Sequence, residues 1–85
     1  MYYTYVLKSK QDGKLYIGSS SNLDLRIEQH YNGQVKSTKH RRPLVLIYKE
    51  EYSTKKEAQS RERYFKGGGK ARKLLEELID NQKGV

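Results

Sequence analysis

Tyr16-Ile17-Gly18 is the most informative segment of the sequence, because it lies in the second arm of a predicted hairpin whose first arm is Tyr2 to Ser9. Aromatic and β-branched side chains, which are typical of strands, fill both that first arm and residues 14–19. Asp12-Gly13 supplies a turn between them. We therefore predict a β-hairpin at the start of the chain.

One face of this hairpin carries two phenols. Side chains alternate across a strand, so an even-length loop puts the following residues on the same face: Tyr3, Tyr5, Leu7, Tyr16 and Gly18. A glycine in a strand lets a backbone or a ligand come close, and we expect Gly18 to make room for a phosphate. Tyrosine is also simply a good strand residue, so this pattern alone leaves its role open.

Length and charge set the outer limits. A chain of 85 residues predicts one domain, which we place at residues 1–80, with residues 81–85 as a flexible tail. The net charge of +8 indicates a polyanionic partner, with nucleic acid as the first choice. No apolar run approaches the ~20 residues of a membrane-spanning helix, and no segment resembles a signal peptide. We expect no membrane partner and a soluble, cytoplasmic protein.

The residue types restrict any metal site. The chain has no cysteine, which excludes disulfides, thiolate chemistry and cysteine zinc sites. Its two histidines are too few for a closed zinc site. We expect any bound metal to be held by oxygen atoms.

A first helix is predicted from a Ser21-Asn22 cap to about Asn32, with Gly33 ending it. Apolar residues recur along it at the helical period: Leu23, Ile27 and Tyr31. Two polar residues, Arg26 and His30, lie at the edge of this apolar stripe. Two interpretations of that edge stay open. It is either a solvated helix face or a cation aimed at a phosphate.

A basic loop follows at residues 34–43, and its side chains are suited to gripping phosphates: Lys36, Lys39, His40, Arg41 and Arg42. A solvated loop without a ligand is the alternative. The apolar run at residues 44–48 then predicts a strand covered on both faces, which implies helices on each side of the sheet.

A second helix is predicted from the capping box at Thr54 and Glu57 to about Lys66. Its spacing turns Glu62 toward the sheet beside Ala58 and Phe65. A carboxylate there needs a metal or an ion-pair partner, for which Arg61, Arg63 and Arg26 are the candidates. After glycines 67–69, a last helix runs to about residue 80, and it carries three further cations: Lys70, Arg72 and Lys73.

This ordered set of motifs resembles the GIY-YIG endonuclease family, with Tyr3-Thr4-Tyr5 standing where that family has Gly-Ile-Tyr. The chain looks most like the small single-domain bacterial members, which are related to the N-terminal nuclease domain of an excision-repair excinuclease. Those members share the basic loop from Thr38 to Pro43. The resemblance implies an α+β fold in which helices flank a small three-stranded antiparallel sheet, in the order β-β-α-β-α-α.

The resemblance also implies an activity and roles for named residues. It implies metal-dependent hydrolysis of DNA, branched or damaged, with one Mg2+ or Mn2+ at Glu62. Tyr5 is then the candidate general base, with its pKa lowered by nearby positive charge. The remaining candidates are His30 as acceptor of the Tyr5 proton, Tyr16 as an orienting group and Arg26 as stabiliser of the transition state.

Besides Tyr3-Thr4 in place of Gly-Ile, the chain departs from the family pattern in two further places. Ser19 stands where the repair branch tends to have a lysine, and residues 74–77 lack the asparagine that many members carry. A binding module that has kept the fold without turnover is therefore an alternative. A small RNA-associated protein is another, and a partner protein that supplies specificity is compatible with each.

Overall fold

The computed structural model describes residues 1–83. Its elements are β1 (Tyr2–Ser9), β2 (Leu15–Ser20), α1 (Leu23–Tyr31), a 3-10 turn η1 (Lys39–Arg41), β3 (Leu44–Tyr52), α2 (Lys55–Lys66) and α3 (Lys70–Lys83). The α+β fold and the order β-β-α-β-α-α are confirmed.

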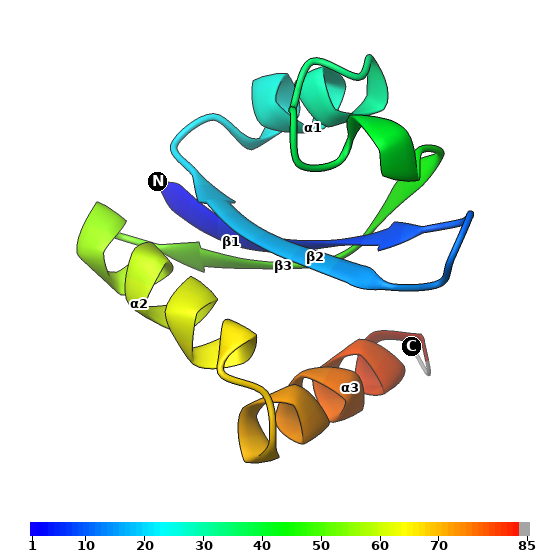
Figure 1. Cartoon of the computed structure of the whole chain (residues 1–85). Helices are drawn as coiled ribbons and strands as arrows, with labels where there is room; N and C mark the ends of the chain where they lie inside the picture. Colours follow the sequence, from blue (N-terminus) through cyan, green and yellow to red (C-terminus); the bar gives the residue numbers. More distant parts are fainter. Residues whose placement is uncertain (84–85) are drawn as a thin grey trace.

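The three strands form one antiparallel sheet in the order β2-β1-β3, so β1 is central. Figure 1 shows α1 and the loop after it on one face of the sheet, and α2 and α3 on the other. The prediction of helices on each side is confirmed. Two apolar layers result, and residues of β1 contribute to both.

The hairpin has the predicted pairing. Tyr5 lies opposite Gly18 and Leu7 lies opposite Tyr16, so both phenols face α1. Gly13 closes the loop with a φ of 73°, a conformation that glycine adopts at little cost. The strand residues therefore point in the directions that alternation predicts.

An irregularity in β3 explains how one apolar run serves both layers. Leu7 of β1 pairs with Leu46, whereas its neighbour Val6 pairs with Tyr48, so the register shifts by one residue at Ile47. Leu46 consequently packs toward α1, and Tyr48 packs toward α2 and α3. The bulge reverses the facing of the strand at this point.

The stripe predicted for α1 is partly wrong. Leu23 is buried and Ile27 packs against the same cluster, but Tyr31 is 45% exposed and His30 is fully buried. The inward-facing positions are thus spaced by four and three residues, at 23, 27 and 30. His30 is therefore an interior residue and does not lie at the edge of the stripe, where we predicted it.

Helix ends follow the predicted signals. The Asn22 side chain accepts a hydrogen bond from the Leu25 N–H, and Thr54 does the same for Glu57. α3 continues to Lys83, so residues 81–83 of the tail that we expected are helical. The rest of that predicted tail, residues 84 and 85, lies outside the described residues. In the described chain, no helix is both long enough and apolar enough to cross a bilayer.

Candidate active site

A chain of hydrogen bonds starts at the central strand and runs into the basic loop. The Tyr5 hydroxyl lies 2.9 Å from Nε2 of His30, and Nδ1 of His30 lies 2.8 Å from Oγ1 of Thr38. All three residues are at most 1% exposed. Strand β1, helix α1 and the loop after it each contribute one member, so the fold holds this chain in place.

Burial sets the charge of His30. Desolvation, followed by the positive charge of Arg26, lowers the pKa of His30 to about 4. The ring is therefore neutral at pH 7, and one of its nitrogens donates while the other accepts. In the tautomer whose Nδ1–H donates to Thr38, the Nε2 lone pair is free to accept the Tyr5 proton.

The pKa of Tyr5 moves the opposite way from our expectation. Burial raises it to about 12, and Arg26, which lowers it, does not compensate. The positive charge that could lower this pKa can be read from the sequence, whereas the depth of burial cannot. The phenol thus stays protonated near neutral pH, and its proton needs an acceptor to leave.

Tyr16 and Arg26 border this chain. The Tyr16 ring centre lies 6.4 Å from that of Tyr5 and 5.0 Å from that of His30. Hydrogen bonding to the Tyr5 hydroxyl raises the pKa of Arg26, with a smaller contribution from Tyr16. Both side chains are half-buried, so they join the buried chain to the surface.

The absence of a side chain at Gly18 makes room for the Tyr5 phenol. A Cβ built on Gly18 would lie 2.5 Å from the Tyr5 hydroxyl oxygen and 2.6 Å from its ring carbon. Any larger residue would push the phenol away from His30. The expectation of a close approach at Gly18 is met by the Tyr5 side chain of the neighbouring strand.

Glu62 reaches the same region from α2, on the other side of the sheet. Its Oε1 accepts a hydrogen bond of 2.7 Å from Ser19, and its Oε2 lies 2.6 Å from the Lys66 ammonium. Lys66 is the ion-pair partner of Glu62, and among the described residues none of the three candidates, Arg61, Arg63 and Arg26, pairs with it. The Glu62 carboxylate also raises the pKa of Tyr5, by less than burial does.

The residues at Glu62 fit a hard divalent cation of limited affinity. Mg2+ is commonly held by one or two carboxylates together with water and substrate phosphates. Among the described residues, no group of three His, Asp or Glu side chains could enclose a metal. Glu62 and the hydroxyl of Ser19 would be the protein's ligands, and such a cation would exchange with Lys66.

The predicted nucleic-acid residues are spread over two regions. Lys36 and Arg26 line one open groove, whereas Arg41 and Arg72 line another beside the hairpin loop. Arg41 also lies 3.9 Å from Asp12. The other members are exposed on the surface: Lys39, His40, Arg42, Lys70 and Lys73. Of these two grooves, the one lined by Lys36 also contains Arg26, which borders the hydrogen-bond chain of Tyr5.

Sequence reasoning missed three participants. Thr38 stands in a loop without periodicity, and nothing in its surroundings in the sequence marks it as buried. Ser19 was noted only as a departure from the family pattern. Lys66 had a usable signal, because it follows Glu62 by four residues on one helix.

The chain is similar to a known domain family and to known proteins. The family model of the GIY-YIG catalytic domain matches residues 1–74. A UPF0213 protein of Staphylococcus saprophyticus is 45% identical over 74 residues, covering 86% of this chain and 89% of that protein. A UPF0213 protein of Clostridium perfringens is 49% identical over 67 residues, covering 78% and 71%.

A solved structure is also similar. The solution NMR structure of a UPF0213 protein from Bacillus halodurans has a TM-score of 0.57 and 33% identity, covering 94% of this chain and 84% of that one. The match extends over the elements that carry the phenols, His30 and Glu62.

Proposed function

Since the chain belongs to the GIY-YIG family, a family of nucleases, we propose that it is an endonuclease that hydrolyses phosphodiester bonds of DNA with one divalent cation. The observation that carries this proposal is the buried chain from Tyr5 through His30 to Thr38, bordered by Arg26 and Glu62. It offers a proton path, a fixed positive charge and a carboxylate at one edge of the sheet.

The proton path assigns Tyr5 as general base. A water molecule that attacks the phosphorus loses its proton to the Tyr5 oxygen while the Tyr5 proton passes to Nε2 of His30. Thr38 holds the ring by accepting from Nδ1–H. Because the pKa of Tyr5 is about 12, no phenolate accumulates, and the two proton transfers occur together.

Charge develops on the phosphoryl oxygens as the water attacks. Arg26 is half-buried, its Nη1 donates to Oε1 of Gln29 at 3.2 Å, and the Tyr5 hydroxyl raises its pKa, so its guanidinium is available to stabilise that charge. Tyr16, beside the same ring, can orient the water or a phosphate oxygen. When bound at Glu62, the cation would supply further charge neutralisation and assist the leaving oxygen.

The decisive test removes the charge of Glu62 without changing its size. We expect Glu62→Gln to abolish Mg2+- or Mn2+-dependent cleavage and to leave DNA affinity within about twofold, since an amide is a weak ligand for a hard cation. Glu77→Gln, an exposed change on α3, is the matched control. Undiminished cleavage by Glu62→Gln, or cleavage in excess chelator, would contradict the metal assignment.

The substrate is best found with a panel. Branched, damaged, single-stranded and duplex DNA, and matched RNA, should be incubated with and without Mg2+ or Mn2+. Cleavage of branched or damaged DNA would support a role in repair. Binding without any cleavage would favour the alternative of a non-catalytic module, and preference for RNA would favour an RNA-associated protein. Cleavage that appears only in cell extract would indicate a partner protein.

A further inference from the structure

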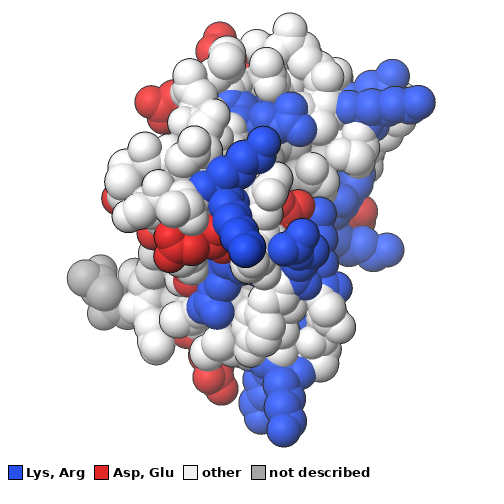
Figure 2. Space-filling model, turned by 90° about the vertical axis from the view of Figure 1, so that its left-hand side faces the viewer, with Lys and Arg blue, Asp and Glu red and all other residues white. Residues whose placement is uncertain are grey.

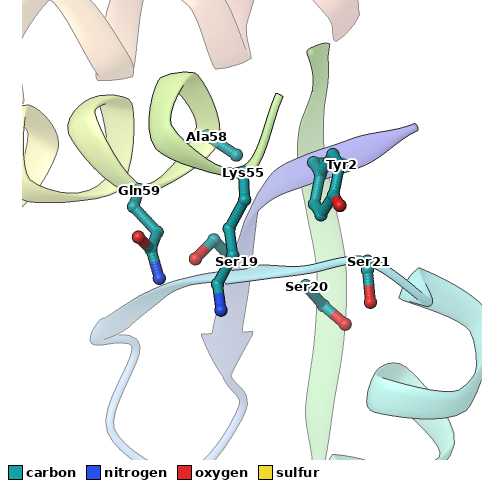
Figure 3. A pocket seen from close by; sticks show the side chains of 7 residues that line it. All are labelled: Tyr2, Ser19, Ser20, Ser21, Lys55, Ala58 and Gln59. Atoms are coloured by element: carbon teal, nitrogen blue, oxygen red, sulfur yellow. The ribbon is translucent and has the colours of Figure 1, made fainter. Parts of the chain in front are cut away.

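A polar cavity lies between the end of β2 and the start of α2 (Figure 3). Its volume is about 230 Å³, and its lining residues are Tyr2, Ser19, Ser20, Ser21, Lys55, Ala58 and Gln59. Within residues 1–83 no carboxylate lines it, although the chain carries ten acidic residues. The lining is therefore made of hydrogen-bond donors, one ammonium group and an aromatic ring.

Its donors are available to a ligand. Figure 3 shows Lys55 and Gln59 extending from α2 toward β2. Among the described residues, neither of these two side chains nor the Ser21 hydroxyl bonds to another side chain, whereas Ser20 is bonded to the backbone of Asn22. A cationic cavity with unused donors favours an anion.

The opposite end of the cavity has a different chemistry. The half-buried ring of Tyr2 stands there, and Ala58 forms an apolar patch of wall between the two ends. Ala58 is 1% exposed, and its carbonyl accepts a 2.8 Å bond from Thr4, which fixes α2 against β1. One end thus suits a phosphate, and the other suits a flat aromatic group.

Ser19 connects this cavity to the candidate active site. It lines the cavity and donates to Glu62 through the same side chain. A ligand in the cavity therefore lies next to the carboxylate proposed to hold the cation. Figure 2 views the side of the molecule where β1 and α2 begin, and Lys and Arg side chains spread across its middle.

We propose that this cavity binds one nucleotide of the substrate strand beside the bond that is cut, with its phosphate on Lys55 and its base against Tyr2. The proposal rests on the proposed function, because it assigns the adjoining residues to a strand that passes Glu62. It adds a subsite for a single nucleotide, whose phosphate and base contact opposite ends of the cavity.

The test compares two neighbouring lysines. Thymidine 5′-monophosphate is titrated into the full chain in chelator, and amide chemical shifts are followed. We expect shifts at residues 19–21 and about tenfold weaker binding by Lys55→Met, the loss of one charge-assisted contact. Lys56→Met is the control, because Lys56 lies outside this cavity and lines another groove. Equal effects of the two substitutions would overturn the proposal.

Further measurements separate the base from the phosphate and this proposal from the enzymatic one. We expect Tyr2→Ala to weaken nucleotide binding and Tyr2→Phe to preserve it. Inorganic phosphate that binds as tightly as the nucleotide would overturn the role of Tyr2. Nucleotide binding without any cleavage would count against the nuclease and not against the cavity. Efficient cleavage with a KM unchanged in Lys55→Met would count against the cavity alone.

Discussion

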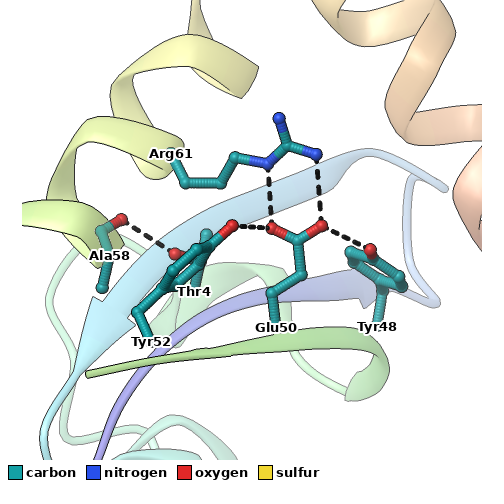
Figure 4. A network of polar contacts seen from close by, with 6 residues as sticks. All are labelled: Thr4, Tyr48, Glu50, Tyr52, Ala58 and Arg61. Carbon is teal, nitrogen blue, oxygen red and sulfur yellow. Dashed lines mark hydrogen bonds and ion pairs between the residues drawn. The ribbon is translucent and has the colours of Figure 1, made fainter. Parts of the chain in front are cut away.

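On the α2 face of the sheet, two phenol hydroxyls bond to one carboxylate; on the α1 face, one phenol hydroxyl bonds to a histidine. The first group consists of Tyr48, Glu50, Tyr52 and Arg61, and Figure 4 shows it together with the bond from Thr4 to Ala58. Both groups combine tyrosines with an arginine. They differ in how many of their hydrogen-bond donors and acceptors are paired within the group.

The α2-face group is closed. The two Glu50 oxygens accept from Tyr48 at 2.5 Å, Tyr52 at 2.6 Å, and Nε and Nη2 of Arg61 at 2.8 and 3.2 Å. Burial raises the pKa of Glu50, but Arg61 and the two hydroxyls lower it further, so it stays below its ordinary value. Each acceptor is used, which indicates a structural role.

The α1-face group is open on one side. Tyr5 and His30 are buried, but Arg26 and Tyr16 reach the surface, and in the described part of the chain no carboxylate bonds to either phenol. An incoming phosphate thus meets a positive charge that is not already paired with an acid in this group. Residue types alone therefore do not distinguish a functional site from a structural network, whereas unused hydrogen-bonding capacity does.

Deleting one hydroxyl from each group tests whether the two groups have different roles. We expect Tyr5→Phe to lower the single-turnover rate by about 100-fold or more, the size expected for losing a general base. Arg26→Ala should have a similar effect, because it removes the charge stabiliser. DNA affinity should barely change in Tyr5→Phe and should weaken modestly in Arg26→Ala.

Tyr48→Phe is the matched control on the other face. We expect it to leave the rate within about twofold and to reduce the free energy of unfolding by about 1 kcal/mol, the usual contribution of one hydrogen bond. A rate defect in Tyr48→Phe as large as that in Tyr5→Phe would remove the distinction between the two groups.

The second prediction concerns stability. Arg61→Met leaves the Glu50 carboxylate, whose side chain is 16% exposed, without its cation. We expect a loss of about 2 kcal/mol in urea unfolding with little change in rate. The double variant with Glu50→Gln should recover part of that loss, and Arg63→Met on the exposed side is the control. Unchanged stability would mean that the closed group is not a support.

The third prediction tests the exchange of Lys66 with the cation. Lys66→Met removes the ammonium that lies 2.6 Å from Glu62, so we expect Mn2+ to bind about tenfold more tightly in isothermal titration. Lys70→Met, which changes an exposed lysine on the next helix, is the control. Weaker Mn2+ binding by Lys66→Met would contradict competition at this carboxylate.

The smallest expected effect is the pH dependence caused by His30. Its folded-state pKa of about 4 lies below the ordinary 6.5, so the unfolded chain binds the proton more readily. The stability from neutral His30 is complete above pH 6.5 and is lost as the pH falls toward 4. We expect a loss of roughly 0.5 kcal/mol by pH 6, allowing for solvent screening near Arg26.

The comparison with His30→Gln isolates this term. Carboxylates with lowered pKa values, such as Glu50, lose their contribution only at lower pH and do so in both proteins. The difference in stability between the wild type and His30→Gln should therefore shrink between pH 7 and pH 5. A constant difference would show that His30 keeps an ordinary pKa.

Local sequence signals are sufficient to predict the helices and strands and the direction in which the hairpin side chains point. Alternation put Tyr5 and Tyr16 on one face, and the caps at Asn22 and Thr54 placed two helix starts, because these signals act within a few residues. The same locality explains why Glu62 was found on the side of α2 turned toward the sheet.

The depth of burial of the site residues and their hydrogen-bond partners depend on the tertiary structure. His30 became an interior residue, the pKa of Tyr5 rose, and Thr38 closed the hydrogen-bond chain, because loop residues 34–43 pack over α1 and β1. Such outcomes depend on contacts between distant segments, and desolvation is a property of the whole packed molecule.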